Sequence, residues 1–452
     1  MEALRPDIVD PRVLLVLRTL AAAGHEAFVV GGAVRDAILG RPVHEWDLAT
    51  SARAEAVADL FPRVVATGLQ HGTVTVVCER LPVEVTTYRG AGAYAGGQPR
   101  AVESVGTIEE DLAHRDLTVN ALAWDPLSGR LLDPFAGRDD LRCRRIRAVG
   151  DARARFEEDP LRTMRAVRFA STLGFRLDRD TRRAIPPLLG RFAQVAVERI
   201  RHELTKILCG AHPRYGIDLL RRTGLLAHVL PELLEGFGLR QNRWHRYDVY
   251  HHVLRAVDAA PADLVVRLAA LLHDVDKPRC AAPSPKAPGE HTFYNHEVSG
   301  AAHAKEILLR LRFPAKVCEE VALLVREHQF AYSDDWSDAA VRRMMARVGR
   351  EHLSRLVAVR EADVRGHGVH VEEGVANVRA LERRVALLQE KELALDVRDL
   401  AVRGSDVMAA LGTGPSPRVG EAMRWLLAQV LEDPSRNTRE GLLALLRTWN
   451  PA

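Results

Sequence analysis

Short apolar runs alternate with helical patterns in the first third of the chain. The run Phe28–Val30 is typical of a buried strand, and residues 33–39 predict a short helix that Gly40 and Pro42 end. Further strands are expected over residues 45–49, 64–66, 73–78 and 82–88. From about residue 141 onward, helical patterns dominate. The pattern therefore predicts an α/β region followed by a helical remainder.

A pair of glycines separates the first predicted strand from the helix after it. Gly31 and Gly32 allow a tight turn and a close approach to a ligand, because no Cβ stands in the way. In the next strand Glu45 and Asp47 are two residues apart, so they share one face and Trp46 takes the other. A phosphate-sized gap at a helix N-terminus, beside two carboxylates, suits phosphoryl or nucleotidyl transfer with two metal ions.

A third carboxylate is expected near this pair. Glu84 lies in the strand predicted over residues 82–88, from which its side chain could face Glu45 and Asp47. Two carboxylates on one strand and a third on a neighbour would serve two divalent metals. The alternative is an acid on an edge strand that points into solvent.

The 452 residues predict two to four domains. No run of 18 apolar residues occurs, so no transmembrane helix is expected, and the first residues lack a signal-peptide pattern. The five cysteines are dispersed and form no Cys-x-x-Cys pair, which argues against a zinc knuckle or a disulfide framework. We therefore expect a cytoplasmic enzyme with no membrane partner.

Positive charge is concentrated in one segment. The formal net charge is only +4, but residues 142–183 carry 13 arginines and six acidic residues. Such a surplus could follow a phosphate backbone, and solvated helix faces are the alternative.

Together with Arg35 and Asp36, the stretch from Phe28 to Thr50 resembles the first motif of the class II nucleotidyltransferases, which include the bacterial CCA-adding enzymes and poly(A) polymerases. The family usually has Asp-x-Asp where this chain has Glu45-Trp-Asp47, and glutamate can also bind a hard cation through oxygen. By resemblance, Gly31, Gly32 and Arg35 are expected to bind the nucleotide.

Residues 110–122 form a helix-prone stretch rich in polar groups. An arginine can clamp a triphosphate, while a carboxylate and an amide can hold ribose hydroxyls. The stretch resembles the second family motif, which implies these roles for Arg115, Asp116 and Asn120; His114 stands where the family has a first arginine. A salt-bridged surface helix is the alternative.

Asp159 and Arg162 are three residues apart at the start of a predicted helix, so their side chains can share a face. A carboxylate accepts a hydrogen bond from the exocyclic amine of cytosine or adenine, and an arginine donates to a neighbouring ring acceptor. Uracil and guanine present an oxygen to the carboxylate instead. The segment Glu158-Asp-x-x-Arg162 resembles the fourth family motif, with Arg165 and Arg168 extending its basic side. A plain ion pair between Asp159 and Arg162 is the alternative.

Three further segments add to the resemblance. Residues 133–141 resemble a turn-rich motif with a structural, hinge-like role, and residues 198–208 resemble a supporting neck helix. The Gly-rich segment 89–104 matches in position the flexible loop that helps CCA-adding enzymes change from adding C to adding A.

Histidines and aspartates recur in the second half of the chain. An adjacent His273-Asp274 ends an apolar helix and offers one nitrogen and one oxygen to a divalent metal. The series resembles the HD phosphohydrolase domain, in which an unidentified divalent metal would activate water against an RNA 3′ phosphate or cyclic phosphate. The expected ligands are His252, His273, Asp274, His296, His328 and Asp363. Core or surface histidines are the alternative.

The resemblance implies an α+β fold with four parts. They are a polymerase-β-type nucleotidyltransferase head at residues 1–140, a helical neck and RNA-binding body at 141–235, an HD domain at 236–370 and a helical tail at 371–452.

The implied reaction adds CMP and AMP from CTP and ATP to the 3′ end of tRNA, with two Mg²⁺ held by Asp47, Glu45 and Glu84. An A-adding enzyme or a poly(A) polymerase shares these motifs. A phosphohydrolase whose head only binds RNA is an alternative from another class, and a non-catalytic tRNA-binding protein is the least favoured.

Overall fold

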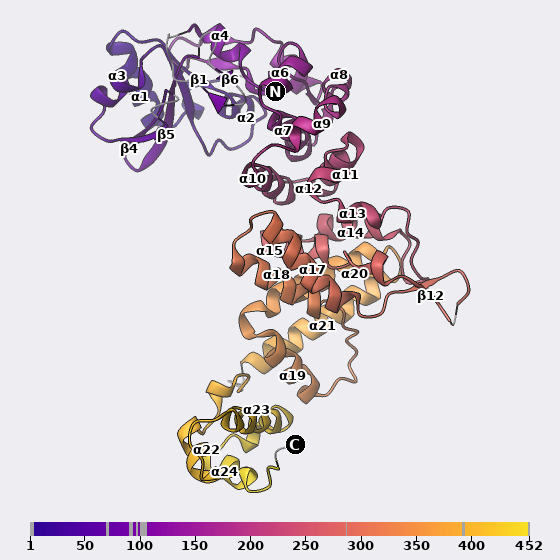
Figure 1. Ribbon diagram of the computed structural model, residues 1–452. Helices are drawn as coiled ribbons and strands as arrows, with labels where there is room; N and C mark the ends of the chain where they lie inside the picture. Colours follow the sequence, from indigo (N-terminus) through magenta and orange to yellow (C-terminus); the bar gives the residue numbers. More distant parts are fainter. Residues whose placement is uncertain are drawn as a thin grey trace. The chain divides into compact units, whose positions relative to one another are not determined.

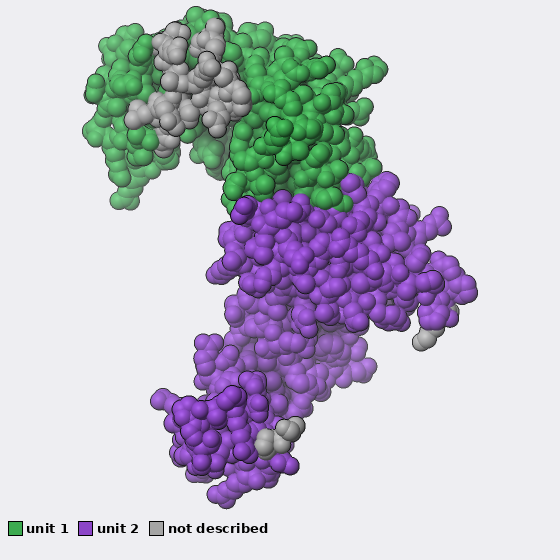
Figure 2. Space-filling view, viewed as in Figure 1, with its two compact units in different colours: residues 1–231 green, residues 232–452 purple. Residues whose placement is uncertain are grey.

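The computed structural model describes residues 4–68, 72–89, 94–95, 98–99, 106–285, 287–390 and 394–450. The chain forms two compact units, residues 1–231 and residues 232–452, which Figure 2 shows in separate colours. The main sheet belongs to unit 1, and unit 2 is almost entirely helical (Figure 1). Within the described part of the chain, no helix has the length and apolar character needed to cross a membrane.

Unit 1 is built on a seven-stranded mixed sheet. The strands lie in the order β3-β4-β5-β2-β1-β8-β9, and β2 and β5 form its parallel pair. The mixed sheet and the helices that follow it confirm the predicted α+β class. The strands are β1 Ala27–Val30, β2 Asp47–Thr50, β3 Val64–Gly68, β4 Thr73–Cys78, β5 Leu81–Thr87, β8 Ala123–Trp124 and β9 Leu131–Leu132.

Four helices accompany the sheet in the head. Helix α1 buries Val13, Val16, Leu17 and Leu20, and it contacts β1, β4 and α3, because these apolar residues recur at helical spacing. The short strands β6 and β7 pair with each other, and most of the Gly-rich segment 89–104 lies outside the described residues. The bounds are α1 Pro11–Ala22, α2 Gly32–Ile38, α3 Ala54–Leu60, α4 Ile108–Ala113, β6 Tyr94–Ala95 and β7 Gln98–Pro99.

The rest of unit 1 is mainly helical. Helix α7 is buried along almost its whole length and packs against α10 and α11. The bounds are α5 Gly137–Arg142, β10 Arg145–Ile146, α6 Ala152–Glu158, α7 Leu161–Leu173, β11 Arg176–Leu177, α8 Arg179–Arg183, α9 Leu189–Phe192, α10 Val197–Leu208, α11 Pro213–Thr223 and α12 Leu226–Val229, with the 3₁₀ turns η1 Pro6–Ile8, η3 Thr118–Asn120 and η4 Pro186–Leu188.

Unit 2 contains a helical bundle and a tail of three helices that has its own apolar core, around Val407, Leu426 and Leu442. The bundle helices α14, α15, α18 and α20 contact one another. The bounds are α13 Glu232–Glu235, α14 Val249–Ala259, α15 Leu264–Leu272, α16 Lys277–Cys280, β12 Ala282–Pro283, β13 His291–Thr292, α17 His296–Arg310, α18 Ala315–Glu327, α19 Asp338–Val348, η5 Arg350–His352, α20 Leu353–His367, α21 Val371–Gln389, η6 Val397–Asp399, α22 Gly404–Leu411, α23 Pro417–Glu432, η7 Pro434–Arg436 and α24 Arg439–Leu446.

Two local expectations were wrong. Residues 110–122 do not form one helix: α4 ends at Ala113, and the backbone continues through an isolated bridge between Leu117 and Ala148 into η3. The strand expected at 45–49 begins only at Asp47, so Glu45 lies just before β2. At both places the end of the element depends on backbone pairing with a segment that is distant in the sequence. Local propensity does not encode such pairing.

A buried carboxylate ties the 3₁₀ turn η3 to the start of the helical part. Asp140 is fully buried, and its oxygens accept hydrogen bonds from Thr118 Oγ1 at 2.6 Å, Arg145 Nε at 2.5 Å and Arg147 Nε at 2.8 Å. Asp140 belongs to the segment 133–141, for which the sequence predicts a structural role.

Replacing Asp140 with Ala is expected to destabilise unit 1 by about 2–4 kcal/mol, because a hydroxyl and two guanidinium groups lose a buried partner. Hydrogen exchange of the η3 and β10 amides measures the loss. Asp139→Ala is the matched control, since Asp139 and its partner Arg142 are both exposed and should change stability by less than about 0.5 kcal/mol. Equal effects of the two variants would contradict the role of Asp140.

Candidate active site and metal centre

Unit 1 contains a polar pocket of about 850 Å³ between the sheet and helices α7 and α10. All the head and neck residues that the sequence singles out for nucleotide or metal binding line this pocket. They are Gly31, Gly32, Arg35, Glu45, Asp47, Glu84, Arg115, Asp116, Asn120, Asp159, Arg162, Arg165 and Arg168.

The acidic side of the pocket depends on the parallel pairing of β2 with β5. Asp47 lies directly opposite Glu84 in this register, so their side chains share one face of the sheet. Glu45 lines the same pocket from an exposed position before β2. Burial, then repulsion by Glu84, raises the pKa of Asp47 to about 6, although Arg115 opposes the shift. Three carboxyl groups gathered at one side of the pocket suit a hard divalent cation.

The glycine turn brings a cationic side chain close to the backbone. Gly31 has a φ of +70°, and a Cβ at this position would lie 2.7 Å from Arg115 Nη1. Gly32 begins α2. Arg35 Nη1 donates to Asn120 Oδ1 at 2.6 Å, and Arg35 also pairs with Asp36 at 2.8 Å. The turn therefore presents arginines where a triphosphate would approach.

Acidic partners fix the basic side chains. Arg115 pairs with the buried Asp111 at 3.1 Å, and Arg165 Nε donates to Asp116 at 2.7 Å. Burial opposes ionisation of Asp116, but Arg165 and other arginines outweigh it and lower its pKa to about 2. Asp116 therefore remains a carboxylate that can accept hydrogen bonds from sugar hydroxyls.

Asp159 and Arg162 both line the pocket, but they do not pair with each other. Asp159 accepts from Arg199 of α10 at 2.6 Å, whereas Arg162 donates to Glu158 at 2.7 Å and to the carbonyl of His114 at 3.1 Å. Each side chain is thus held separately, which differs from the plain ion pair considered as an alternative.

Helix α10, for which the sequence predicted only a supporting role, also supplies side chains to the pocket wall. Glu203 is 2% exposed and accepts from Arg168 at 2.6 Å, while Arg199 holds Asp159. The Arg168 guanidinium also stacks 3.7 Å from the centroid of Phe169. The sequence feature that could have predicted this role is the four-residue spacing of Arg199 and Glu203, which places both on one helix face.

Much of the arginine surplus in residues 142–183 is taken up by internal pairs, such as those of Arg145 and Arg147 with Asp140. A second hollow of about 540 Å³ nevertheless contains Arg41, Arg144 and Arg176. Its lining among the described residues contains no carboxylate, so it is a basic surface.

Unit 2 holds a separate, buried cluster that unites the six ligands expected for an HD centre. The Nε2 atoms of His252 and His273 are 3.0 Å apart, and Asp363 Oδ1 lies 3.1 Å from the first and 3.4 Å from the second. Asp274 extends the cluster, because its Oδ1 lies 3.2 Å from His296 Nε2 and 3.9 Å from His328 Nε2. The six side chains come from α14, the end of α15, α17, the end of α18 and α20.

Three of these histidines share one hydrogen-bond pattern. The Nδ1 atoms of His273, His296 and His328 donate to the carbonyl oxygens three residues earlier, at 2.9, 2.6 and 2.6 Å. Their Nε2 lone pairs therefore remain for the cluster, as in histidines that bind a metal.

The carboxylates of the cluster favour positive charge at His273, where a bound cation would take the place of the second ring proton. Burial opposes a proton on His273, but Asp274 and Asp363 outweigh it and raise its pKa to about 10. Both Asp274 oxygens and His296 Nε2 are buried without a well-aligned hydrogen-bond partner in the described structure, although Lys277 Nζ lies 2.7 Å from Asp274. The donor set of imidazoles and carboxylates therefore fits one or two divalent cations.

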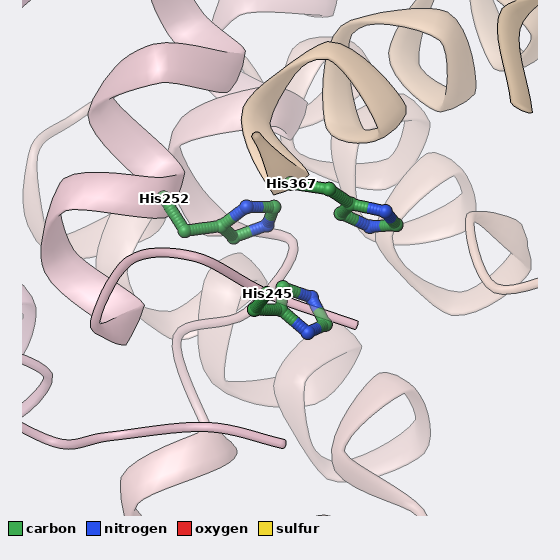
Figure 3. A group of neighbouring side chains, drawn as sticks. All are labelled: His245, His252 and His367. Atoms are coloured by element: carbon green, nitrogen blue, oxygen red, sulfur yellow. The ribbon is translucent and has the colours of Figure 1, made fainter. Parts of the chain in front are cut away.

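Two further histidines border this cluster, and the sequence analysis missed both. His245 lies before α14, and His367 lies at the end of α20, four residues after Asp363. Figure 3 shows their rings gathered with that of His252. The four-residue spacing of Asp363 and His367 places both on one helix face, so the sequence could have revealed His367. The loop that carries His245 has no such periodicity.

Three family models match the chain. They describe a poly A polymerase head domain over residues 27–147, a "probable RNA and SrmB-binding site of polymerase A" over residues 174–236, and a tRNA nucleotidyltransferase domain 2 over residues 293–446.

The chain is similar to curated CCA-adding enzymes. The enzyme of Geobacillus stearothermophilus is 33% identical over 437 residues, which span 96% of this chain and 96% of the relative. The enzyme of Geobacillus thermodenitrificans is 45% identical over 238 residues, 52% of this chain and 58% of that relative, so this match spans little more than half of the relative's length.

Solved structures give the same result for the fold. The CCA-adding enzyme of Bacillus stearothermophilus in complex with CTP is 32% identical, with a TM-score of 0.74 over 97% of this chain and 96% of that one. The Thermotoga maritima CCA-adding enzyme complexed with tRNA is 20% identical, with a TM-score of 0.56 over 97% and 96%, and it supports the fold alone.

The raised pKa of Asp47 predicts a cost of ionisation that cation binding would remove. The ordinary pKa is 3.8, and the pKa in the folded chain is about 6. Between these two pH values the unfolded chain loses the proton and the folded chain keeps it, so the free energy of unfolding falls as the pH rises. Without divalent cations and above pH 6, Asp47→Asn is expected to stabilise β2 and β5 by about 1–3 kcal/mol, and near pH 4 by much less.

Hydrogen exchange of the β2 and β5 amides in EDTA measures this difference. Asp59→Asn, at an exposed position of α3, is the control and should change nothing. A destabilised Asp47→Asn variant at pH 7.5 would contradict the account.

Proposed function

The chain belongs to the family of CCA-adding enzymes, and we propose that its N-terminal pocket adds CMP and AMP from CTP and ATP to the 3′ end of tRNA. The observation that carries this proposal is the register that sets Asp47 opposite Glu84, beside Glu45 and the glycine turn. The carboxylates that would bind metal and the turn that would bind the triphosphate therefore face the same pocket.

Glu45, Asp47 and Glu84 would hold two Mg²⁺ ions, which when bound supply charge neutralisation at the attacking 3′-hydroxyl and the leaving pyrophosphate. The backbone at Gly31 and Gly32, with Arg35 and Arg115, binds and orients the triphosphate. Asp116 and Asn120 accept and donate hydrogen bonds at the ribose.

Base choice would rest on Asp159 and Arg162. A carboxylate that faces the base accepts from the exocyclic amine of cytosine or adenine and repels the oxygen of uracil or guanine. Arg199 orients the Asp159 carboxylate, and Glu158 orients the Arg162 guanidinium. Arg165 and Arg168 complete the basic wall, each held by its own acid.

We propose the four-part organisation with boundaries after residues 140, 235 and 370. The division of the chain after residue 231 lies close to the second boundary, and the separate apolar core around Leu426 supports a distinct tail. A tRNA-modifying activity would place the protein in the cytoplasm.

Incorporation of nucleotides into tRNAs that lack one, two or all three terminal nucleotides tests the proposal. The wild type should add CMP, CMP and AMP in the order required, and Asp47→Ala should lower the rate by about a thousandfold or more, because several kcal/mol of charge stabilisation are lost.

Asp59→Ala is the control and should keep the wild-type rate. Incorporation of AMP alone would favour an A-adding enzyme or a poly(A) polymerase, and incorporation of neither nucleotide would reject the assignment.

A second activity is supported by the buried cluster of His252, His273, Asp274, His296, His328 and Asp363. We propose that it hydrolyses a phosphomonoester or a 2′,3′-cyclic phosphate at an RNA end. A divalent metal held by these residues would supply an activated water. Lys277, 2.7 Å from Asp274 Oδ2, orients that carboxylate, and Arg360 does so for Asp363.

His273→Ala separates the two activities. We expect it to abolish phosphate release or ring opening on RNA ends, measured with Mg²⁺, Mn²⁺, Co²⁺, Ni²⁺ or Zn²⁺, while CMP incorporation stays within about threefold of wild type, since the two sites belong to separate units. Asp47→Ala should behave in the opposite way. A wild-type chain that hydrolyses no RNA end with any of these metals would contradict the second activity.

A further inference from the structure

A third group of potential metal ligands lies at the edge of the buried cluster. Each of the rings of His245, His252 and His367 offers one nitrogen, and these three atoms lie within 4.8 Å of one another. The ring centroids are 4.9 Å apart for His245 and His252, 4.5 Å for His245 and His367, and 5.5 Å for His252 and His367 (Figure 3).

We infer that His245, His252 and His367 form an additional cation site, adjacent to the six-residue cluster, for a divalent transition metal such as Zn²⁺ or Co²⁺. The inference rests on the proposed use of that cluster as a metal centre, because His252 belongs to both, but it does not depend on hydrolysis.

The tautomer of His245 is set for ligation. Its Nδ1 lies 3.0 Å from Asn242 Oδ1, which also accepts from the Trp244 amide at 3.2 Å, so Nδ1 carries the proton and donates. The Nε2 lone pair is left available. His273, His296 and His328 show the same arrangement, with Nδ1 donating to an oxygen three residues earlier.

The other two ligands meet at a carboxylate that also serves the six-residue cluster. Asp363 Oδ1 lies 3.2 Å from His367 Nε2 and 3.1 Å from His252 Nε2, while Arg360 pairs with Oδ2. His252 is fully buried, and its Nδ1 has no hydrogen-bond partner in the described structure. A neutral imidazole has one lone pair, so His252 would serve both sites only as an imidazolate. It would lose its remaining proton to solvent and bind one ion through Nε2 and the other through Nδ1, the nitrogen without a partner.

The donor set predicts the class of metal. Three imidazoles select Zn²⁺, Co²⁺, Ni²⁺ or Cu²⁺, whereas carboxylate oxygens such as those of Asp47 and Glu84 suit Mg²⁺. Nitrogens around a tetrahedral zinc are about 3.3 Å apart, so atoms within 4.8 Å need to close by no more than about 1.5 Å.

Counting ions on the full-length chain tests the site. The protein is stripped with a chelator, dialysed against Co²⁺ and analysed for cobalt per chain. The wild type should hold one more Co²⁺ than His245→Gln or His367→Gln. His251→Gln is the matched control: His251 neighbours His252 on α14 but pairs with Asp248, so this variant should keep the wild-type count. The acids of unit 1 are unchanged in all four proteins and cancel in the comparison.

A His245→Cys variant identifies the ligand directly. A thiolate bound to Co²⁺ gives a charge-transfer absorption band that an unbound thiol lacks, so this variant should keep the additional ion and gain the band. Equal cobalt counts in wild type, His245→Gln and His367→Gln would overturn the inference, as would a His245→Cys protein without the band.

These outcomes are separable from those of the proposed hydrolase. A chain that binds the additional ion but hydrolyses no RNA end contradicts only the hydrolase. A chain that hydrolyses RNA ends, with a cobalt count unaffected by His245→Gln and His367→Gln, contradicts only the additional site.

Discussion

The parallel pairing of β2 with β5 is the constraint on which the N-terminal pocket depends. It brings Asp47 and Glu84, which are distant in the sequence, to the same point on one face of the sheet. A shift of the register by one residue would turn Glu84 to the other face and separate the carboxylates. Burial, and then repulsion by Glu84, raises the pKa of Asp47, so the backbone hydrogen bonds of the sheet hold together two acids that would otherwise separate. A cation bound by these acids would offset that repulsion.

On the opposite wall of the pocket, three arginines each have an acidic partner from another element. Asp116 holds Arg165, Glu203 holds Arg168, and Arg199 holds Asp159. These pairs fix side-chain rotamers before a nucleotide arrives, so less conformational entropy is lost on binding. The same pairs connect the segment after α4 to α7 and α10, and the pocket therefore depends on packing throughout unit 1.

Much of this could be predicted from the sequence, because the relevant signals are local. The glycine turn and the acid pair at Glu45 and Asp47 show characteristic residues at short spacings. The adjacent His273-Asp274 marks the histidine cluster, whose other ligands lie far apart in the sequence. The sequence indicated that Glu84 could face this pair but left a solvent-facing position open, because the register between β2 and β5 is not encoded locally. The partner of Asp159 could not be predicted, since Arg199 lies 40 residues away on a helix whose orientation depends on tertiary packing. His245 was missed for the same reason, because a histidine in an irregular loop has no periodicity that predicts its direction.

Helix α7 contributes both to the hydrophobic core and to the wall of the pocket. Its buried residues include Met164, Val167 and Ala170 of the core together with Arg162 and Arg168 of the pocket wall. A helix packed on nearly every side cannot rotate or shift to accommodate another base without disturbing the core, where even one methylene is felt. Surrounding positions such as Glu158 and Arg199, which orient the side chains from outside the helix, can change at a lower cost to the core. Redesign of this pocket wall is therefore expected to succeed at those surrounding positions rather than within α7.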